Sequence, residues 1–404
     1  MHIPYLTADL PGVGGRIKVQ NADFCVHEIP LYEPSGRGEH VYVTIEKDGL
    51  TTHQAVERIA RDLHISPRTV GSAGLKDAHA VTRQMLSLGA VDPARVEALS
   101  VPGIRLLEVS RHTNKLKMGH LRGNRFTIRI RDVDPEALPQ AQAIVDVLVA
   151  RGIPNAYGVQ RFGLRGDTHL LGEALLHRDA EALVRRLVGM PHPAESPRVQ
   201  RARQLFDDGD LEACLEAWPR NMNNERRVVQ RLLDRHGDWE RALWAVPHNM
   251  KKFYLSAYQG ALFNQVLVQR LDTIDQLQMG DLANIHGKRA VFVVEDVAAE
   301  QPRADRLEIS PSGPLYGYKL TMAQGRPGQM EQQVLDEHGL TLEDFRIKGL
   351  KMRGARRPLR IPLSEAKLWY DEGIVLSFSL PPGSYATRVL AEVMKGEPDP
   401  TMSV

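Results

Sequence analysis

The segment Gly71–Gln84, GSAGLKDAHAVTRQ, places a charged pair among small residues. Gly74 gives the backbone the freedom that a close approach requires. Asp77 follows Lys76 directly, and a nearby cation keeps an aspartate ionised and able to meet a ligand. The same residues would also form a plain glycine turn with a solvated aspartate.

The composition is that of a soluble globular protein, and the chain is long enough for two domains. The chain has 404 residues, of which 42% are hydrophobic and 25% charged. It has no run of 18 apolar residues, and its N-terminus, MHIPY, does not resemble a signal peptide. We therefore expect a cytoplasmic location, no membrane association, and free thiols at Cys25 and Cys214. No His/Cys spacing fits a zinc site, and we expect no metal site.

The net charge is only +2, so a nucleic-acid surface would require local clustering of cations. Two such runs exist. Residues 111–131 and residues 346–360 each contain seven Lys or Arg and no Asp or Glu. Each run is either a solvated charged face or part of a nucleic-acid surface.

The first third of the chain contains several stretches of alternating hydrophobicity, which predict strands. These stretches are Arg16–Val19, Asp23–Glu28, His40–Lys47, Val101–His112 and Asn124–Arg131. In the second, Phe24, Val26 and Glu28 share one face. In the last, apolar Phe126, Ile128 and Ile130 alternate with Arg125, Arg129 and Arg131, which predicts a sheet with a cationic front.

Helical periodicity begins after Thr51, where Thr51 and Gln54 have the spacing of a capping box. It returns over 135–151 and dominates 170–270. Short strands are predicted at 283–286 and 290–294, a Pro/Gly-rich loop at 311–317, helices at 330–337 and 342–345, and a strand at 373–380. Strands, then helices, then a returning strand indicate an α+β fold with an inserted domain.

Two further stretches combine glycine with aromatic and polar groups. Asn155–Gly163, NAYGVQRFG, is either a turn with an aromatic core residue or an aromatic and amide platform for an extruded base. Gly383–Thr387, GSYAT, makes a turn that places Tyr385 at a helix start.

These motifs resemble the TruD family of tRNA pseudouridine synthases. The matching elements are GLKD with AVT at 74–82, NAYGVQRFG, GSYAT, and supporting matches at 23–28, 119–126 and 262–265. They follow the family's order and cover nearly the whole chain. Ala156 and Tyr385 depart from residues common in bacterial members, and the segment 195–250 is closer to archaeal members.

The resemblance implies a fold and a domain plan. It implies a pseudouridine synthase core with a mixed, mostly antiparallel sheet, into which an α/β TruD-specific domain is inserted. The core would comprise residues 1–170 and 350–404, and the insertion residues 171–349. A monomer is expected on the same basis.

The resemblance also implies the activity: isomerisation of uridine to pseudouridine, at position 13 in the D arm of tRNA, without cofactor. The family's nucleophilic aspartate falls on Asp77, which would act either as the nucleophile or as a base in a glycal route. Independently of the resemblance, we expect Lys18 or another nearby cation to pair with Asp77. Family positions that hold the substrate fall on Phe24, Asn155, Tyr157, Gln160, Arg161 and Tyr385. The rival functions are a catalytically inactive RNA-binding or RNA-folding protein, against which Asp77 argues, and a metal-dependent nuclease, which would need clustered acids.

Overall fold

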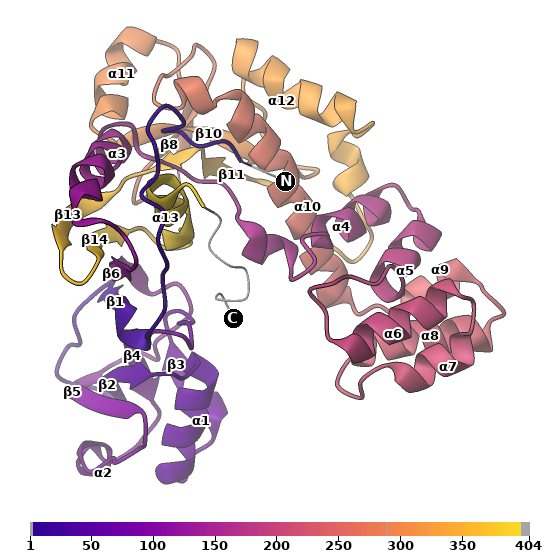
Figure 1. Cartoon of the computed structure of the whole chain (residues 1–404), viewed down its shortest axis with the longest axis horizontal. Coiled ribbons are helices and arrows are strands. Elements are labelled where there is room, and N and C mark those ends of the chain that lie inside the picture. Colours follow the sequence, from indigo (N-terminus) through magenta and orange to yellow (C-terminus); the bar gives the residue numbers. More distant parts are fainter. Residues whose placement is uncertain (1–2, 289, 397–404) are drawn as a thin grey trace. The chain divides into compact units, whose positions relative to one another are not determined.

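The structure is a computed structural model that describes residues 3–288 and 290–396. The chain forms two compact units (Figure 1). The sheet unit contains Tyr5–Ile153 and the chain from Ile361 onward; the helix-rich unit contains Pro154–Arg360 with Ile3 and Pro4. The chain passes between them within the short strands β7 (Ile153–Pro154) and β12 (Arg360–Ile361). Residues 397–404, which the domain plan assigns to the core, lie outside the described part.

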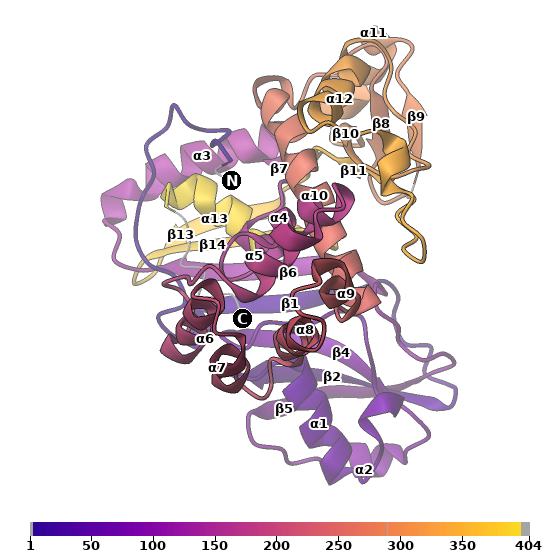
Figure 2. The ribbon, with the colours of Figure 1, turned by 90° about the vertical axis from the view of Figure 1, so that its right-hand side faces the viewer.

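The sheet unit is built on an eight-stranded sheet with the order β13-β14-β6-β1-β4-β2-β5, in which β3 also pairs with β4 (Figure 2). The strands are β1 (Phe24–Pro30), β2 (His40–Asp48), β3 (Gly71–Ser72), β4 (Val81–Leu88), β5 (Ile104–His112), β6 (Leu121–Ile130), β13 (Ser364–Tyr370) and β14 (Ile374–Leu380). β1 and β4 are parallel, and the other pairs in this sheet are antiparallel. The predicted α+β fold with a mixed, mostly antiparallel sheet is therefore confirmed.

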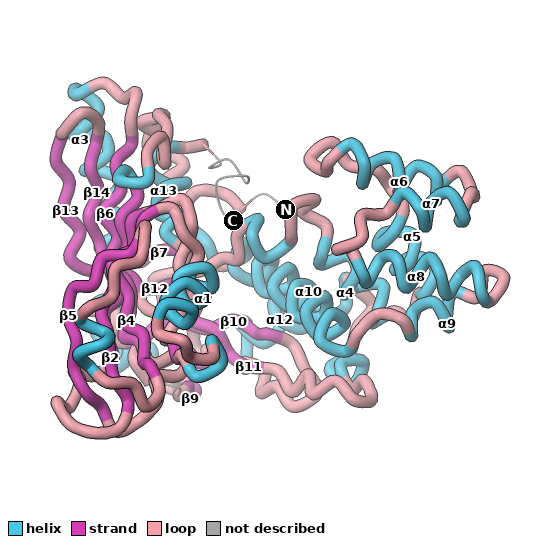
Figure 3. The backbone as a smooth tube through the Cα atoms, turned by 90° about the horizontal axis from the view of Figure 1, so that it is seen from below, coloured by secondary structure: helices cyan, strands magenta, loops and turns pink. Residues whose placement is uncertain are grey.

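One face of this sheet, which we call the core face, is covered by helices. The helices of the unit are α1 (Thr52–Asp62), α2 (Pro93–Glu97), α3 (Leu138–Arg151) and α13 (Ala386–Met394). Figure 3 shows α1 and α13 on the same side of the strands. Apolar residues of α1, among them Ile59, pack against Val43 and Leu86 of the strands. The predicted capping box of α1, between Thr51 and Gln54, is present.

The opposite, open face differs from its predicted charge. The alternation in β6 is confirmed, because Phe126, Ile128 and Ile130 are buried. The arginines between them, however, are neutralised by acids that are distant in sequence. The pairs are Arg125–Glu365 (2.6 Å), Arg129–Asp371 (2.5 Å) and Arg131–Asp23 (2.7 Å). The predicted cationic front is therefore wrong for these three arginines, because each of them is ion-paired with a carboxylate.

The second basic run is also partly structural. Arg356 is paired with Glu331 at 2.6 Å with both side chains buried, and Arg360 is fully buried and donates to the Ala304 carbonyl. Lys348, Lys351 and Arg353 remain exposed on the surface of the helix-rich unit. The acid-free run thus supplies fewer solvent-facing cations than its sequence suggests.

The helix-rich unit contains the helices predicted over 170–270 and a small sheet. Its helices are α4 (Thr168–Leu176), α5 (Ala180–Val188), α6 (Pro197–Asp207), α7 (Leu211–Ala217), α8 (Asn223–Asp234), α9 (Trp239–Trp244), α10 (His248–Gln269), α11 (Val297–Asp305) and α12 (Gly325–Glu337). Helices α4–α9 share one apolar core around Trp218 and Cys214. The sheet has the order β11-β10-β8-β9, with β8 (Leu282–Ile285), β9 (Val291–Val293), β10 (Ile309–Leu315) and β11 (Ala355–Pro358).

The predicted loop at 311–317 is wrong, because most of it is strand β10. The strand is buried along nearly its whole length between β8 and β11, which pair with it on either side. A Cβ at Gly313 would lie 2.8 Å from Leu359 and 3.0 Å from Phe263 of α10, so glycine here permits close packing. Tertiary packing overrides the local turn preference of proline and glycine.

Other element predictions need smaller corrections. Arg16–Val19 is not a strand, since only Arg16 forms a bridge, to Arg131. Strand β13 and helix α11 were not predicted. Strand β13 lies at the edge of the sheet and is mostly exposed, and α11 carries Pro302 in its interior. Both features weaken the periodic pattern on which such predictions depend.

The buried ion pair between Glu331 and Arg356 provides a stability test. Glu331 also accepts the Ala323 N–H at 3.0 Å. Replacing Glu331 by Gln leaves Arg356 as a buried, uncompensated charge, which we expect to lower the unfolding free energy of the helix-rich unit by about 3 kcal/mol. Urea unfolding followed by tryptophan fluorescence measures this, because Trp218, Trp239 and Trp244 all lie in this unit.

The matched control is Glu337→Gln, an exposed residue on the same helix, α12, for which a change within about 0.5 kcal/mol is expected. Equal unfolding midpoints for the two variants would show that the buried pair does not stabilise the unit.

Candidate active site

The parallel pairing of β1 with β4 brings two distant segments together. In this register Cys25 lies beside Val81. Because parallel strands begin at the same edge of a sheet, the segment that leads into β1 and the segment that leads into β4 lie next to each other. The first carries Lys18 and the second carries Asp77. The predicted pairing of these two residues therefore follows from the sheet topology.

The Asp77 carboxylate is held through both of its oxygens. Oδ2 accepts a hydrogen bond from Lys18 Nζ, and Oδ1 accepts the His79 N–H at 3.2 Å. The Lys18 side chain is 6% exposed and that of Asp77 is 22% exposed. The carboxylate is thus ion-paired and oriented, yet it remains partly open to solvent and to a ligand.

Lys18 is held in an unusual conformation beside Phe24. Its φ of 57° lies in the left-handed region, which costs a non-glycine residue about 1 kcal/mol. Its ammonium lies 4.6 Å from the centre of the Phe24 ring. Phe24 is buried and meets Phe126 edge to face. Lys18, Phe24 and Asp77, all predicted as site residues, are therefore neighbours.

Lys76, which precedes Asp77 in sequence, is directed to a different carboxylate. Its ammonium pairs with Glu28 at 2.6 Å, with both side chains buried. Gly74 makes room for this pair, since a Cβ there would lie 3.3 Å from Lys76 Nζ. The group that approaches Gly74 closely is therefore the Lys76 ammonium. The cation that pairs with Asp77 is Lys18 and not Lys76.

Lys47 also contacts the Asp77 loop and was not singled out from the sequence. It is fully buried, and its Nζ donates to the Asp77 main-chain carbonyl at 2.7 Å and to the Leu50 carbonyl. A signal was present in the sequence: Lys47 continues the inward series of Val43 and Ile45 in β2. A charged residue at an inward position of a strand is unusual and merits a functional explanation.

Tyr385 lies in the sheet unit at the start of α13, as predicted. It is the N-cap residue of this helix and follows Gly383, whose φ is +76°. The ring is half-buried, and among residues 3–288 and 290–396 its side chain makes no hydrogen bond or ring contact. The ring is therefore available for stacking, although no contact with Asp77 is present.

Asn155 belongs to the helix-rich unit, where its side chain is already hydrogen-bonded. Its Nδ2 donates to the Pro358 carbonyl at 2.9 Å, and its Oδ1 accepts from Arg357 at 2.5 Å. An amide has two N–H groups and two lone pairs on oxygen, so one of each remains for another partner.

The other predicted residues of this motif surround one aromatic ring. Arg161 and Arg357 lie 5.4 Å and 4.3 Å from the centre of the Tyr157 ring. Asn264 receives the Tyr157 N–H at 2.8 Å and donates to its carbonyl at 2.9 Å, which fixes the main chain. Gln160 is exposed. The motif thus holds an aromatic ring beside two arginines, and its use as a platform for an extruded base stays a prediction.

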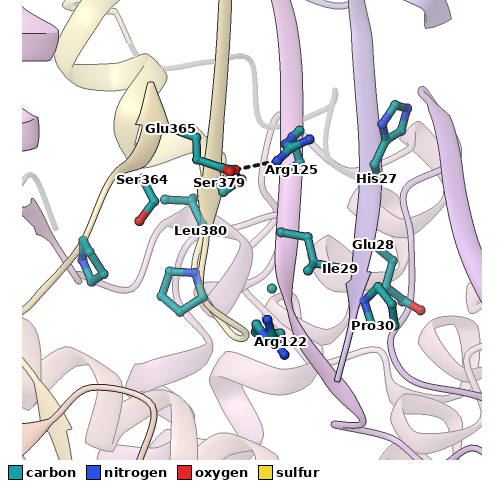
Figure 4. Close-up of a pocket in the computed structure, with 13 residues that line it drawn as sticks. His27, Glu28, Ile29, Pro30, Arg122, Arg125, Ser364, Glu365, Ser379 and Leu380 are labelled. Atoms are coloured by element: carbon teal, nitrogen blue, oxygen red, sulfur yellow. Dashed lines mark hydrogen bonds and ion pairs between the residues drawn. The ribbon is translucent and has the colours of Figure 1, made fainter. Parts of the chain in front are cut away.

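A cavity of about 520 Å³ lies in the sheet unit but holds none of the predicted site residues (Figure 4). It is lined by His27, Arg125 and Ser379, which are register partners on the open face of the sheet. The ion pair of Arg125 with Glu365 forms part of its wall. Its lining includes Glu28, the partner of Lys76, but neither Lys18 nor Asp77.

Within the described residues, no group of three or more His, Cys, Asp or Glu side chains is arranged to hold a metal ion. None of the described helices has the length and apolar character needed to cross a membrane.

Nearly the whole chain is similar in sequence to proteins of one known family. The sequence profile of the family tRNA pseudouridine synthase D (TruD) matches residues 1–393. The chain is 50% identical over 393 residues to tRNA pseudouridine synthase D of Geobacter sulfurreducens, covering 97% of this chain and 96% of that protein. It is also 50% identical to the corresponding protein of Geobacter metallireducens over 394 residues, with coverage of 97% and 98%.

The fold agrees with a solved structure as well. The crystal structure of a candidate tRNA pseudouridine synthase D (TruD) from Methanosarcina mazei superposes with a TM-score of 0.86 at 29% identity, over 98% of this chain and 99% of that one. The chain therefore belongs to the tRNA pseudouridine synthase D (TruD) family, and the family resemblance of its motifs is confirmed.

Proposed function

We propose that this protein isomerises uridine to pseudouridine in tRNA, at position 13 of the D arm, with Asp77 as the nucleophile. The observation that carries the proposal is the Asp77 carboxylate, ion-paired with Lys18 and partly open, in a chain of this family. The family names supply the reaction class and the RNA. The geometry supports one oriented carboxylate, which is what the reaction requires.

The chemistry explains why one carboxylate suffices. The N1–C1′ bond of uridine breaks, the base turns, and a C5–C1′ bond forms, while the proton on C5 is lost and N1 gains one. Asp77 attacks C1′ and holds the sugar while the uracil turns. No electrons are gained or lost overall, so the reaction requires no redox cofactor. Lys18 donates to the Asp77 carboxylate and orients it before the substrate arrives.

The target uridine must leave the base stack to reach Asp77. We assign substrate contacts to Phe24 and Tyr385 by stacking, and to Asn155 by its remaining N–H and lone pair. A stacked base is stabilised by about 1–3 kcal/mol. Tyr157, Gln160 and Arg161 provide an aromatic and cationic platform for the neighbouring nucleotides.

Phosphate contacts are assigned to those cations of the two basic runs that pair with no carboxylate among residues 3–288 and 290–396. In the sheet unit these are Arg111, Lys115, Lys117 and Arg122. In the helix-rich unit they are Lys348, Lys351 and Arg353. Such contacts position the RNA but do not select its sequence.

The direct test of the proposal is Asp77→Asn. The amide has nearly the same shape but cannot act as a nucleophile, so we expect no pseudouridine in tRNA transcript, whereas wild type modifies uridine 13. Carbodiimide-stop sequencing after incubation with EDTA measures this. Asp92→Asn, at the N-cap of α2, is the matched control, because asparagine also caps helices and activity should be retained.

Pseudouridine formation by Asp77→Asn at a rate near that of wild type would contradict the assigned role. Tight tRNA binding by wild type without any modified uridine would instead identify an inactive RNA-binding protein. Cleavage of the tRNA that EDTA stops would indicate a metal-dependent nuclease.

A second prediction separates the charge of Lys18 from its backbone strain. Lys18→Asn removes the ammonium but tolerates the left-handed conformation, whereas Lys18→Met removes the charge and retains the strain. If the ion pair orients Asp77, both variants lose about 10²–10³-fold in single-turnover rate, as happens when one oriented electrostatic partner is removed. Near-normal turnover by Lys18→Asn would show that Lys18 does not serve catalysis.

A further inference from the structure

Lys47 is a buried cation without a carboxylate partner in the described part of the chain. Its side chain is fully buried on the core face, and its two hydrogen bonds go to main-chain carbonyls, those of Asp77 and Leu50. Buried ammonium groups are normally ion-paired, because losing water costs several kcal/mol per charge. A lysine kept here at that cost requires an explanation other than fold stability.

The hydrogen bond to Asp77 gives that explanation. Lys18 holds the Asp77 side chain, whereas Lys47 holds its main chain. This hydrogen bond fixes the direction of the peptide that follows Asp77. Two residues later, the His79 N–H donates to Asp77 Oδ1 at 3.2 Å. Between β3 and β4 the loop has no helix or strand of its own to fix this peptide.

No neighbouring group replaces this contact. Thr82 lies opposite Lys47 on β4, and Gln84 follows on the same face. Their atoms Oγ1 and Nε2 are buried and have no hydrogen-bond partner among the described residues. Neither side chain is engaged with the Asp77 carbonyl, so Lys47 is the donor that fixes it.

We infer that Lys47 is a positioning residue: its ammonium fixes the Asp77 peptide and, through it, the direction of the catalytic carboxylate. This inference rests on the proposed role of Asp77. The two lysines then have separate roles: Lys18 pairs with the charged Asp77 carboxylate, and Lys47 fixes the position of the Asp77 main chain.

The charge of Lys47 should be sensitive to mild alkali. Burial is the main cause that lowers its pKa, to about 8; Asp77 and Asp48 oppose the shift and Lys76 adds to it. An unfolded lysine has a pKa of about 10.4, so between these values the unfolded chain holds more protons and stability rises with pH. Below pH 8 the buried charge therefore costs stability while it holds Asp77 in place.

The test is Lys47→Met, which keeps the length and apolar stem but removes the donor. A 1 Å misplacement of a reacting group can cost about 10²-fold, so we expect a loss of about that size in single-turnover rate. The tRNA dissociation constant should stay within about threefold. The melting temperature at pH 7 should change little, because relief of the buried charge offsets the loss of two hydrogen bonds. Lys367→Met, exposed on β13, is the control and should match wild type.

The pH profile provides an independent measurement. The wild-type single-turnover rate should fall as the pH rises through about 8, and Lys47→Met should lack this limb. Ionisation of the substrate uracil in stronger alkali remains in both proteins. If Lys47→Met does not fold, Lys47→Gln takes its place in both measurements, because its amide is neutral at every pH and should likewise lack the limb at about pH 8.

A rate for Lys47→Met within threefold of wild type, or a pH limb unchanged by the substitution, overturns the inference. These outcomes are distinct from failure of the proposed function, in which wild type itself forms no pseudouridine or Asp77→Asn remains active.

Discussion

The parallel pairing of β1 with β4 is the constraint on which the candidate active site depends. The other pairs described in this sheet are antiparallel, and an antiparallel arrangement here would place the start of β4 at the far edge from the start of β1. Parallel pairing brings the two strand starts to one edge, where Lys18 meets Asp77. Register matters equally, because a shift of one residue would turn Phe24 and Glu28 from the core face to the open face.

Around that edge the protein buries several charges, each with its own acceptor. Lys18 donates to the Asp77 carboxylate, Lys47 donates to the Asp77 main-chain carbonyl, and Lys76 donates to the Glu28 carboxylate. Apolar residues of similar volume would often be as stabilising as such groups. Several buried charged side chains around one partly exposed aspartate are typical of a functional site. Such groups lower the stability of the fold but hold the site in a fixed geometry.

Much of the sheet unit could be predicted from local pattern. Alternation identified β2 and β6 and the buried face of Phe126, and the spacing of Thr51 and Gln54 identified the start of α1. These successes share a cause: each depends on residues close in sequence, whose pattern directly reflects which face is buried or where a helix begins. The GLKD motif singled out Asp77, whose catalytic role stays a prediction.

The rest depends on contacts between distant residues. Arginines in β6 meet acids that lie some 240 positions later, so a run without acids gave a misleading expectation of a cationic face. Strand β10 carries Pro311, Gly313 and Pro314, which locally favour a turn, and only its neighbours β8 and β11 make it a strand. Lys47 could have been noticed as a charge at an inward strand position, but its acceptor became visible only in three dimensions.

We propose that the position of the Asp77 carboxylate, and not merely its charge, makes the site catalytic. Asp77→Glu tests this most directly, since it keeps the charge and a partner for Lys18 but moves the carboxylate outward by one methylene. Single-turnover conversion of uridine 13 in full-length tRNA should fall by about 10²-fold or more, with tRNA binding retained. Conversion at the wild-type rate would contradict the claim.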